Sequence, residues 1–378
     1  MKLAVKKNLL IIVGIALLSI PTILHNAGFT KPARSKKPPR HIIFPYLKPS
    51  RLLTAKTGEK SISDSISLYY SEMAGFKEFL LPVFMSIKNH IFNVSPYPGK
   101  VVYGREGWLF LGDDNSKVIS ESKGLINFTD KELNKILINM LNVNEYCRQR
   151  NIQFYMAFAP DKSDIYGNLL PIFKTDRPTK LDQVTSCLSK SGIKIINLGR
   201  DFGKYKDRRL YLKTNSHWNQ FGMFIGYQSL MKEIQFDFSK VTILNIEQFV
   251  LDTIQKDEED LTRMISLKRI DQEVLLTPKY RSISSVEKNK ITIPKGYTLN
   301  PKLFEHRFSK LNRNYKALVF HDSFFEFISK FMKENFKESV FLYSSFNYRL
   351  IDDEKPDIII YELAGREVDV LLQEHVIL

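Results

Sequence analysis

Two short segments of the chain could bring a nucleophile and a base together. Residues 317–325 read ALVFHDSFF, so an apolar run ends at Asp322 and Ser323 and a further apolar run follows. A serine on a sharp strand-to-helix turn exposes its hydroxyl above the sheet, and backbone N–H groups at the helix start can hold an oxyanion. Residues 213–222 read KTNSHWNQFG and place His217 in a loop before an apolar helix. Either segment alone also fits a structural role, since Asp and Ser commonly cap helices.

The elements around these segments predict an α/β fold. Short apolar runs typical of buried strands alternate with amphipathic runs of helical period. The expected strands are 152–159, 194–198, 317–320, 339–344 and 357–363, and the expected helices start at a capping box at Thr129 and cover 181–189, 221–231 and 324–336. This alternation is typical of a mostly parallel sheet with helices on both faces. The polar stretch 240–310, with an acidic patch at 257–260, interrupts the rhythm and predicts an insertion or irregular arm.

From about Val101 to the C-terminus the chain resembles the SGNH-hydrolase-like domain of the alginate O-acetyltransferase family, of the AlgX/AlgJ type. The segments that carry the resemblance, in order, are GREGWLFL (104–111), APDKSDIYGNLLP (159–171), KTNSHWNQFG, EDLTRMISL (259–267), the DSF of 322–324 and PDIIIYELAGR (356–366). Two positions depart from the usual motifs, with Asp161 in place of Asn and Gly365 in place of Glu. The shared order implies an SGNH-hydrolase-like fold.

The resemblance implies a Ser–His–Asp triad, with Ser323 as nucleophile and His217 as base. The acid of the triad would fall at position 215, where this chain has Asn215. In serine proteases the same exchange lowers turnover by roughly 10⁴-fold. Three readings stay open: Asn215 orients His217 through its carbonyl oxygen, a carboxylate from elsewhere serves (Asp161 or Asp322), or catalysis has been lost.

Other residues of these motifs are expected to support the site. Trp218, Asp322 and Asp161 are interpreted as supporting or substrate-binding residues. His321 stands where many SGNH proteins carry Gly, two residues before Ser323. We interpret His321 as structural or substrate-facing and not as the base.

No cofactor or metal is expected. The seven histidines are scattered and no two lie at i, i+4, and there is no Gly-rich loop of the kind that binds nucleotides. Cys147 and Cys187 could pair in an oxidising compartment, but their spacing does not require a disulfide.

The N-terminal end carries most of the positive charge. The first 60 residues hold 12 Lys or Arg and a single acid, Glu59, so they account for +11 of the net +15. Residues 1–28 combine three lysines with an uncharged 16-residue run from Leu9 to Leu24, which predicts a signal-anchor or, alternatively, a cleaved signal peptide. Residues 29–60 are basic and Pro-rich and predict a linker, and 61–378 would form the acetyltransferase domain.

Together these features predict an extracytoplasmic O-acetyltransferase that acetylates polysaccharide hydroxyls. The domain would lie on the periplasmic side of the inner membrane, anchored by a single pass. By resemblance, a polytopic membrane-bound O-acyltransferase would supply the acetyl group. Asn215 motivates the alternative of a glycan-binding or scaffold subunit, and the same residues also fit a polysaccharide acetyl esterase. With only +4 on residues 61–378, a nucleic-acid partner is not expected.

Overall fold

The computed structural model describes residues 83–172, 175–282, 284–287 and 305–373. The expected anchor (1–28) and linker (29–60) lie outside these residues. The chain divides into two units, Met1–Pro96 and Tyr97–Leu378. The first unit contributes the short π-helix η2 (Ile87–Ile91). None of the helices in the described part of the chain has both the length and the apolar character needed to cross a membrane.

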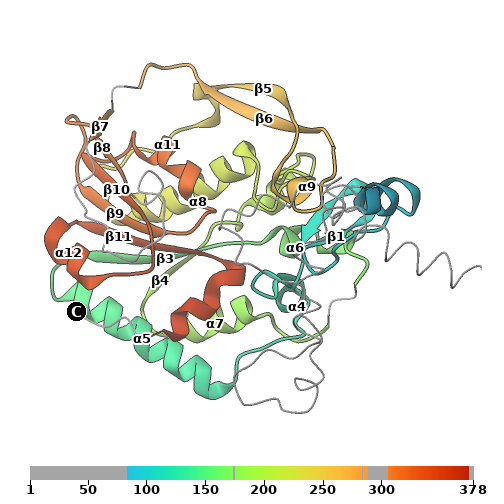
Figure 1. Cartoon of the computed structure of the whole chain (residues 1–378). Helices are drawn as coiled ribbons and strands as arrows, with labels where there is room; N and C mark the ends of the chain where they lie inside the picture. The colour runs from blue at the N-terminus through green and yellow to red at the C-terminus, as the bar shows by residue number, and fades with distance from the viewer. Residues whose placement is uncertain (1–82, 173–174, 283, 288–304, 374–378) are drawn as a thin grey trace, which may run out of the picture. The chain divides into compact units, whose positions relative to one another are not determined.

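The second unit is built on a seven-stranded sheet (Figure 1) with the strand order β4-β3-β11-β9-β10-β8-β7. The strands are β3 (Gln153–Ala159), β4 (Lys194–Asn197), β7 (Ser285–Glu287), β8 (Glu305–Ser309), β9 (Lys316–His321), β10 (Glu338–Tyr343) and β11 (Ile358–Ala364). The first five strands in the spatial order are parallel, and β8 and β7 add an antiparallel edge. The expected mostly parallel sheet is confirmed.

Both faces of the sheet are covered by helices, as predicted. On one face lie α5 (Asp130–Arg148), α7 (Lys180–Leu188) and the 3-10 helix η8 (Gly365–Leu372), and on the other α8 (Gln220–Asp237) and α11 (Ser329–Met332). Because successive strand residues point to opposite faces, Phe154 and Met156 of β3 join one core, and Tyr155 and Ala157 join the other. This two-sided burial explains why the strands read as continuous apolar runs.

Two expectations are corrected by the structure. The run 324–336 is not one helix: a turn leads into the 3-10 helix η7 (Glu326–Ile328) and then into the single turn of α11. The stretch 240–310 is not simply irregular, because β5 (Phe249–Lys256) and β6 (Asp271–Pro278) pair along their whole length. We call this pair, with the connection between its strands, the hairpin arm; the connection contains the short helix α9 (Asp260–Met264).

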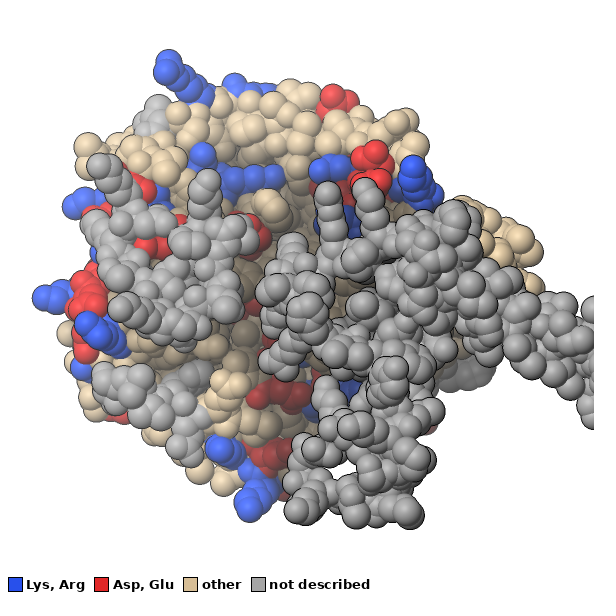
Figure 2. Space-filling model, in the orientation of Figure 1, with Lys and Arg blue, Asp and Glu red and all other residues tan. Residues whose placement is uncertain are grey.

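Smaller features complete the second unit. The strands β1 (Val101–Tyr103) and β2 (Leu109–Leu111) form a separate antiparallel pair. Short helices lie between the larger elements: η3 (Arg105–Gly107), α4 (Val118–Ser122), α6 (Lys162–Ile165), η4 (Gly167–Leu169), η5 (Phe202–Tyr205), η6 (Ile246–Gln248) and α12 (Tyr348–Glu354). Cys147 and Cys187 are both free thiols. On the face drawn in Figure 2, basic side chains are interspersed with acidic ones.

The carboxyl ends of three neighbouring parallel strands bring the predicted site residues to one edge of the sheet. Asp161 follows β3, Ser323 follows β9, and Arg366 follows β11, which lies between them. In open α/β sheets the carboxyl ends of the strands form the usual crevice for ligands. The topology therefore places the candidate site at this edge.

The start of α8 is packed directly against the strand-like segment before His217. A Cβ on Gly222 would lie 2.3 Å from the carbonyl oxygen of Leu210, which also accepts a hydrogen bond from the backbone N–H of Asn219 at 2.9 Å. Since both contacts involve backbone, this part of the structure has little room to adjust.

We predict that Gly222→Ala lowers the free energy of unfolding by about 1–3 kcal/mol, the usual cost of overpacking, although alanine favours helix. Gly203→Ala is the matched control, because a Cβ at Gly203 meets nothing within 4 Å. Chemical denaturation of the two variants and the parent measures the difference. Equal stability of the two variants would contradict the close packing of α8.

Candidate active site

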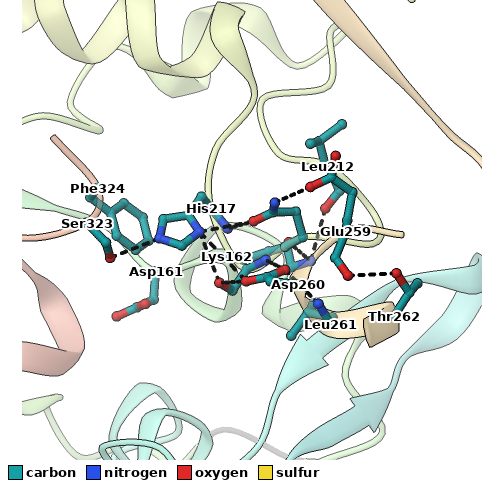
Figure 3. Close-up of polar contacts among 12 residues, drawn as sticks. Asp161, Lys162, Leu212, His217, Glu259, Asp260, Leu261, Thr262, Ser323 and Phe324 are labelled. Carbon is teal, nitrogen blue, oxygen red and sulfur yellow. Dashed lines mark hydrogen bonds and ion pairs between the residues drawn. The ribbon is translucent and has the colours of Figure 1, made fainter. Parts of the chain in front are cut away.

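His217 and Ser323 meet at the carboxyl edge of the sheet (Figure 3). The imidazole Nε2 of His217 lies 3.0 Å from the hydroxyl oxygen of Ser323, although the two residues are 106 positions apart. His217 comes from the loop before α8, and Ser323 from the turn after β9. A base within hydrogen-bond reach of a hydroxyl can take its proton as the oxygen attacks. The structure thus brings together the nucleophile and base expected from the sequence.

Asn215 faces the other nitrogen of the imidazole. Its side-chain oxygen lies 3.0 Å from Nδ1 of His217 and also accepts the backbone N–H of His217 at 2.9 Å. When the Ser323 hydroxyl donates to Nε2, Nδ1 carries the ring proton and donates it to the Asn215 oxygen. This geometry matches the first of the three readings, in which Asn215 orients His217.

Two carboxylates of the hairpin arm complete this side of the site, and their role was missed in the sequence. Glu259 accepts a hydrogen bond from the Asn215 amide nitrogen at 2.5 Å. Asp260 accepts one from the Ser216 hydroxyl at 2.5 Å, and its Oδ2 lies 3.8 Å from Nδ1 of His217. Both residues start the segment EDLTRMISL, which is recognisable in the sequence only as a family motif. Their contact with Asn215 and Ser216 depends on the folding of the hairpin arm.

Asp161 and Asp322, the carboxylates proposed in the second reading, bind elsewhere. Asp161 accepts the guanidinium of Arg366 at 2.6 Å and the backbone N–H of Arg366 at 2.8 Å. Asp322 accepts the backbone N–H groups of Phe324 and Ala364, each at 2.7 Å. Both are therefore supporting residues: Asp161 ties β3 to β11, and Asp322 ties the Ser323 turn to β11.

Trp218 and His321 are buried supports. The indole N–H of Trp218 donates to the carbonyl of Phe324 at 2.9 Å, which links the His217 loop to the Ser323 turn. His321 is 3% exposed, its Nδ1 lies 2.7 Å from the carbonyl oxygen of Asp322, and its ring packs against Phe325 and other aromatic rings. These contacts agree with the structural interpretation of His321.

Tyr343 is a further neighbour of the nucleophile that the sequence did not reveal. Its phenol lies close enough to Ser323 for the two side chains to interact. Tyr343 ends β10, and the parallel register pairs it with His321 at the end of β9. Only the pairing of the two strands shows that Tyr343 lies beside the serine.

The electrostatic surroundings keep His217 neutral. Burial, followed by the positive charge of Arg366, lowers the pKa of His217 to about 4, and the negative charge of Asp260 partly opposes this. Arg366 lies over one aromatic ring of the site: its guanidinium carbon is 4.8 Å from the centroid of the Phe324 ring, which in turn lies 4.9 Å from that of the imidazole. A neutral imidazole at pH 7 is the form that can accept a proton.

Two buried acids lie beneath the serine turn. Burial raises the pKa of Asp322 to about 6 and that of Glu362 well above its usual value, and the negative charge of Asp322 raises that of Glu362 further. The backbone N–H of Asp322 donates to Glu362 at 3.3 Å. Like-charged carboxyl groups in contact resist ionising together. The pair therefore holds one proton near neutral pH, on Glu362, and carries one negative charge where two ionised carboxyl groups would carry two.

Lys162 fixes the loop that carries Asn215 and His217. Its buried ammonium group donates to the carbonyl oxygens of Leu212 (3.0 Å), Lys213 (3.3 Å) and Asn215 (2.6 Å). Burial lowers the pKa of Lys162 to about 7. The residue lies one position after Asp161, so the end of β3 both ties down β11 and positions the catalytic loop.

We predict that Lys162 makes stability depend on pH. Between about pH 7 and its ordinary pKa of 10.5, Lys162 holds a proton in the unfolded chain but not in the folded one, so the free energy of unfolding rises with pH. In Lys162→Met this contribution is absent. The stability of the parent relative to this variant should therefore increase from pH 6 to pH 10 in denaturation experiments. Lys206→Met, at an exposed position, should show no such trend; a flat difference for both variants would contradict the prediction.

Within the described residues, no group of three or more His, Cys, Asp or Glu side chains could hold a metal ion. A cavity of about 640 Å³ opens beside α6 and η4. Its lining combines cationic, hydroxyl and apolar side chains, among them Arg105, Lys123, Ser163 and Leu170. Ser163 also lines a separate small pocket together with Lys162, Ser216 and Arg366.

Comparison with known proteins agrees with this architecture. Residues 101–300 match the family described as SGNH hydrolase-like domain, acetyltransferase AlgX; the match includes His217 and Glu259 and ends before Ser323. Bacillus cereus PatB1 superposes with a TM-score of 0.54 at 18% identity, covering 72% of this chain and 99% of PatB1. A DHHW family protein from Eubacterium siraeum gives a TM-score of 0.52 at 11% identity, covering 74% of this chain and 95% of its own. At such low sequence identities, these superpositions show a shared fold and nothing more. Among curated protein sequences, none matches this chain significantly. Since the family match spans more than half of the chain, the protein belongs to the SGNH-hydrolase-like acetyltransferases of the AlgX family.

Proposed function

We propose that the protein is an O-acetyltransferase that moves an acetyl group onto polysaccharide hydroxyls through an acetyl-serine intermediate. The observation that carries the proposal is the 3.0 Å contact between His217 Nε2 and Ser323 Oγ in a member of an acetyltransferase family. The neutral state of His217, favoured by burial and by Arg366, suits a general base.

In the first half-reaction, Ser323 attacks the carbonyl carbon of an acetyl ester donor. His217 takes the serine proton as the new C–O bond forms, and the carbonyl oxygen becomes an oxyanion. Tyr343, whose side chain lies near Ser323, is available to donate a hydrogen bond to this oxygen. As the tetrahedral intermediate collapses, the bond to the donor oxygen breaks, and the imidazolium returns its proton to that oxygen.

In the second half-reaction, a sugar hydroxyl attacks the acetyl-serine ester. His217 now takes the proton of the sugar hydroxyl and returns it to Ser323 as the serine leaves. The cavity beside α6 suits an acceptor glycan, since it combines polar side chains with the apolar Leu170 and Pro171. Water in place of the sugar hydroxyl would make the same site an esterase.

We further propose the cellular setting expected from the sequence. The apolar run Leu9–Leu24 behind lysines favours a single membrane anchor. The resemblance to the AlgX/AlgJ type is the reason for proposing the periplasmic side for the catalytic domain. A polytopic membrane-bound O-acyltransferase is the proposed source of acetyl groups, because an extracytoplasmic enzyme needs a donor delivered across the membrane.

We predict that Ser323→Ala abolishes acetyl transfer. The full-length protein is given a chromogenic acetyl ester with and without oligosaccharide acceptors, and chromophore release, free acetate and acetylated sugar are quantified. Ser189→Ala, an exposed serine at the end of α7, serves as the control and should match the parent. Equal turnover by Ser323→Ala and the parent would remove Ser323 from the mechanism, and acetate without acetylated sugar would favour the esterase.

We also predict an unusually acidic lower limb of the pH–rate profile. His217 must be neutral to accept a proton, and its pKa is lowered to about 4, so kcat/KM should stay level from pH 7 down to about pH 5 and fall below it. Steady-state rates with the chromogenic ester, corrected for non-enzymatic hydrolysis, measure this limb. A midpoint near 6.5, the ordinary pKa of histidine, would contradict the proposed environment of His217.

A further inference from the structure

We infer that Glu259 and Asp260, on the hairpin arm, act through Asn215 and Ser216 to give His217 the negative charge that an aspartate gives it in a Ser–His–Asp triad. The inference rests on the proposed function, because it concerns the base of that reaction. Asn215, Glu259 and Asp260 are positioning residues here, since they act on the reacting atoms through His217.

Glu259 determines which end of the Asn215 amide faces the imidazole. A carboxylate accepts hydrogen bonds and cannot donate them, so it holds the NH₂ of Asn215, at 2.5 Å, and turns the amide oxygen towards His217. The opposite orientation would set the amide oxygen against the Glu259 carboxylate and the NH₂ against Nδ1. It would favour the tautomer with the proton on Nε2, which cannot take the proton of Ser323.

The Glu259 carboxylate also polarises the Asn215 amide. Hydrogen bonds in a chain polarise one another, so a bond from Asn215 to a carboxylate makes the Asn215 oxygen a stronger acceptor for the proton on Nδ1. The order Glu259, Asn215, His217, Ser323 thus extends the triad by one residue. The amide of Asn215 occupies the place of the aspartate, and Glu259 supplies the charge that the amide lacks.

Asp260 provides a second, more direct contribution. Its Oδ2 is 3.8 Å from Nδ1 of His217, and the hydroxyl of Ser216 bridges them, donating to Asp260 at 2.5 Å and lying 3.2 Å from Nδ1. Asp260 is held in place by the backbone N–H groups of Ser216 (2.9 Å) and Leu261 (2.7 Å). This carboxylate favours the imidazolium that forms during proton transfer, against the opposing charges of Arg366 and Lys162.

This arrangement predicts that restoring the aspartate at position 215 is not sufficient to raise activity. In Asn215→Asp the new carboxylate would sit in hydrogen-bond contact with Glu259, and two carboxylates in contact cannot both stay ionised. In Asn215→Asp/Glu259→Gln the glutamine amide can donate to the new aspartate. The single negative charge then lies at position 215 and no longer at position 259. If catalysis had simply been weakened by loss of an acid, Asn215→Asp alone would suffice.

The experiment compares kcat/KM and its pH dependence for the full-length parent, Glu259→Gln, Asp260→Asn, Asn215→Asp and the double variant, all with the chromogenic ester. Glu258→Gln is the matched control, because Glu258 is the exposed neighbouring acid. Thermal unfolding of every variant separates loss of fold from loss of rate.

We expect Glu259→Gln and Asp260→Asn each to lower kcat/KM by about tenfold, the difference between a charge-assisted and a neutral hydrogen bond. Asn215→Asp should give no gain, and the double variant should be at least tenfold faster than Asn215→Asp. The lower limb of the pH–rate profile should move to higher pH in the double variant, since a carboxylate next to the imidazole raises its pKa; a merely structural role would leave this limb in place.

We call the transfer of negative charge from Glu259 and Asp260 to His217 the relay. The relay is overturned if Glu259→Gln and Asp260→Asn both have the kcat/KM of Glu258→Gln. It is also overturned if kcat/KM rises as much in Asn215→Asp alone as in the double variant. Failure of the proposed function looks different, since Ser323→Ala would then be as active as the parent. An inactive Ser323→Ala together with unaffected Glu259 and Asp260 variants would leave the acetyltransferase in place and remove only the relay.

Discussion

The hydrogen bond from the Trp218 indole to the carbonyl of Phe324 joins the two loops on which the site depends. Trp218 follows His217 and Phe324 follows Ser323, so this 2.9 Å bond sets the distance between base and nucleophile. It can do so because both partners are buried against the core between α8 and the sheet, where an indole N–H needs an acceptor. A flexible surface contact between residues so far apart in sequence would cost more chain entropy than it returns.

Buried charges hold the rest of the carboxyl edge in one arrangement. Lys162 binds three carbonyl groups of the loop before His217, and Arg366 binds Asp161. Buried charges are tolerated only when they are paired and hydrogen-bonded, so each of these contacts strongly disfavours alternative loop positions. The same cations lower the pKa of His217, which means that the groups that order the site also determine the protonation state of its base.

The parallel sheet and the pair Ser323–His217 could be predicted from the sequence, because apolar runs, helix caps and motif order are local signals. The partners of His217 could not. Glu259 lies 44 residues from Asn215, and it reaches Asn215 only because β5 and β6 pair into a hairpin arm that the polar composition of 240–310 concealed. Tyr343 was missed for a similar reason, since its place beside Ser323 follows from strand register and not from its neighbours in sequence.

The hairpin arm also separates two properties that a conventional triad combines. The nucleophile and base belong to the turn after β9 and the loop before α8, whereas the carboxylates that face them, Glu259 and Asp260, lie at the start of α9, in the connection of the two-stranded hairpin arm. The arm is nevertheless fixed to the core of the domain, because Leu261 and Ile265 of its connection are fully buried there. Under the inferred role of Glu259 and Asp260, the basicity of the active site depends on a segment outside the main sheet, whereas the geometry of attack depends on the loops that follow the sheet strands and precede α8.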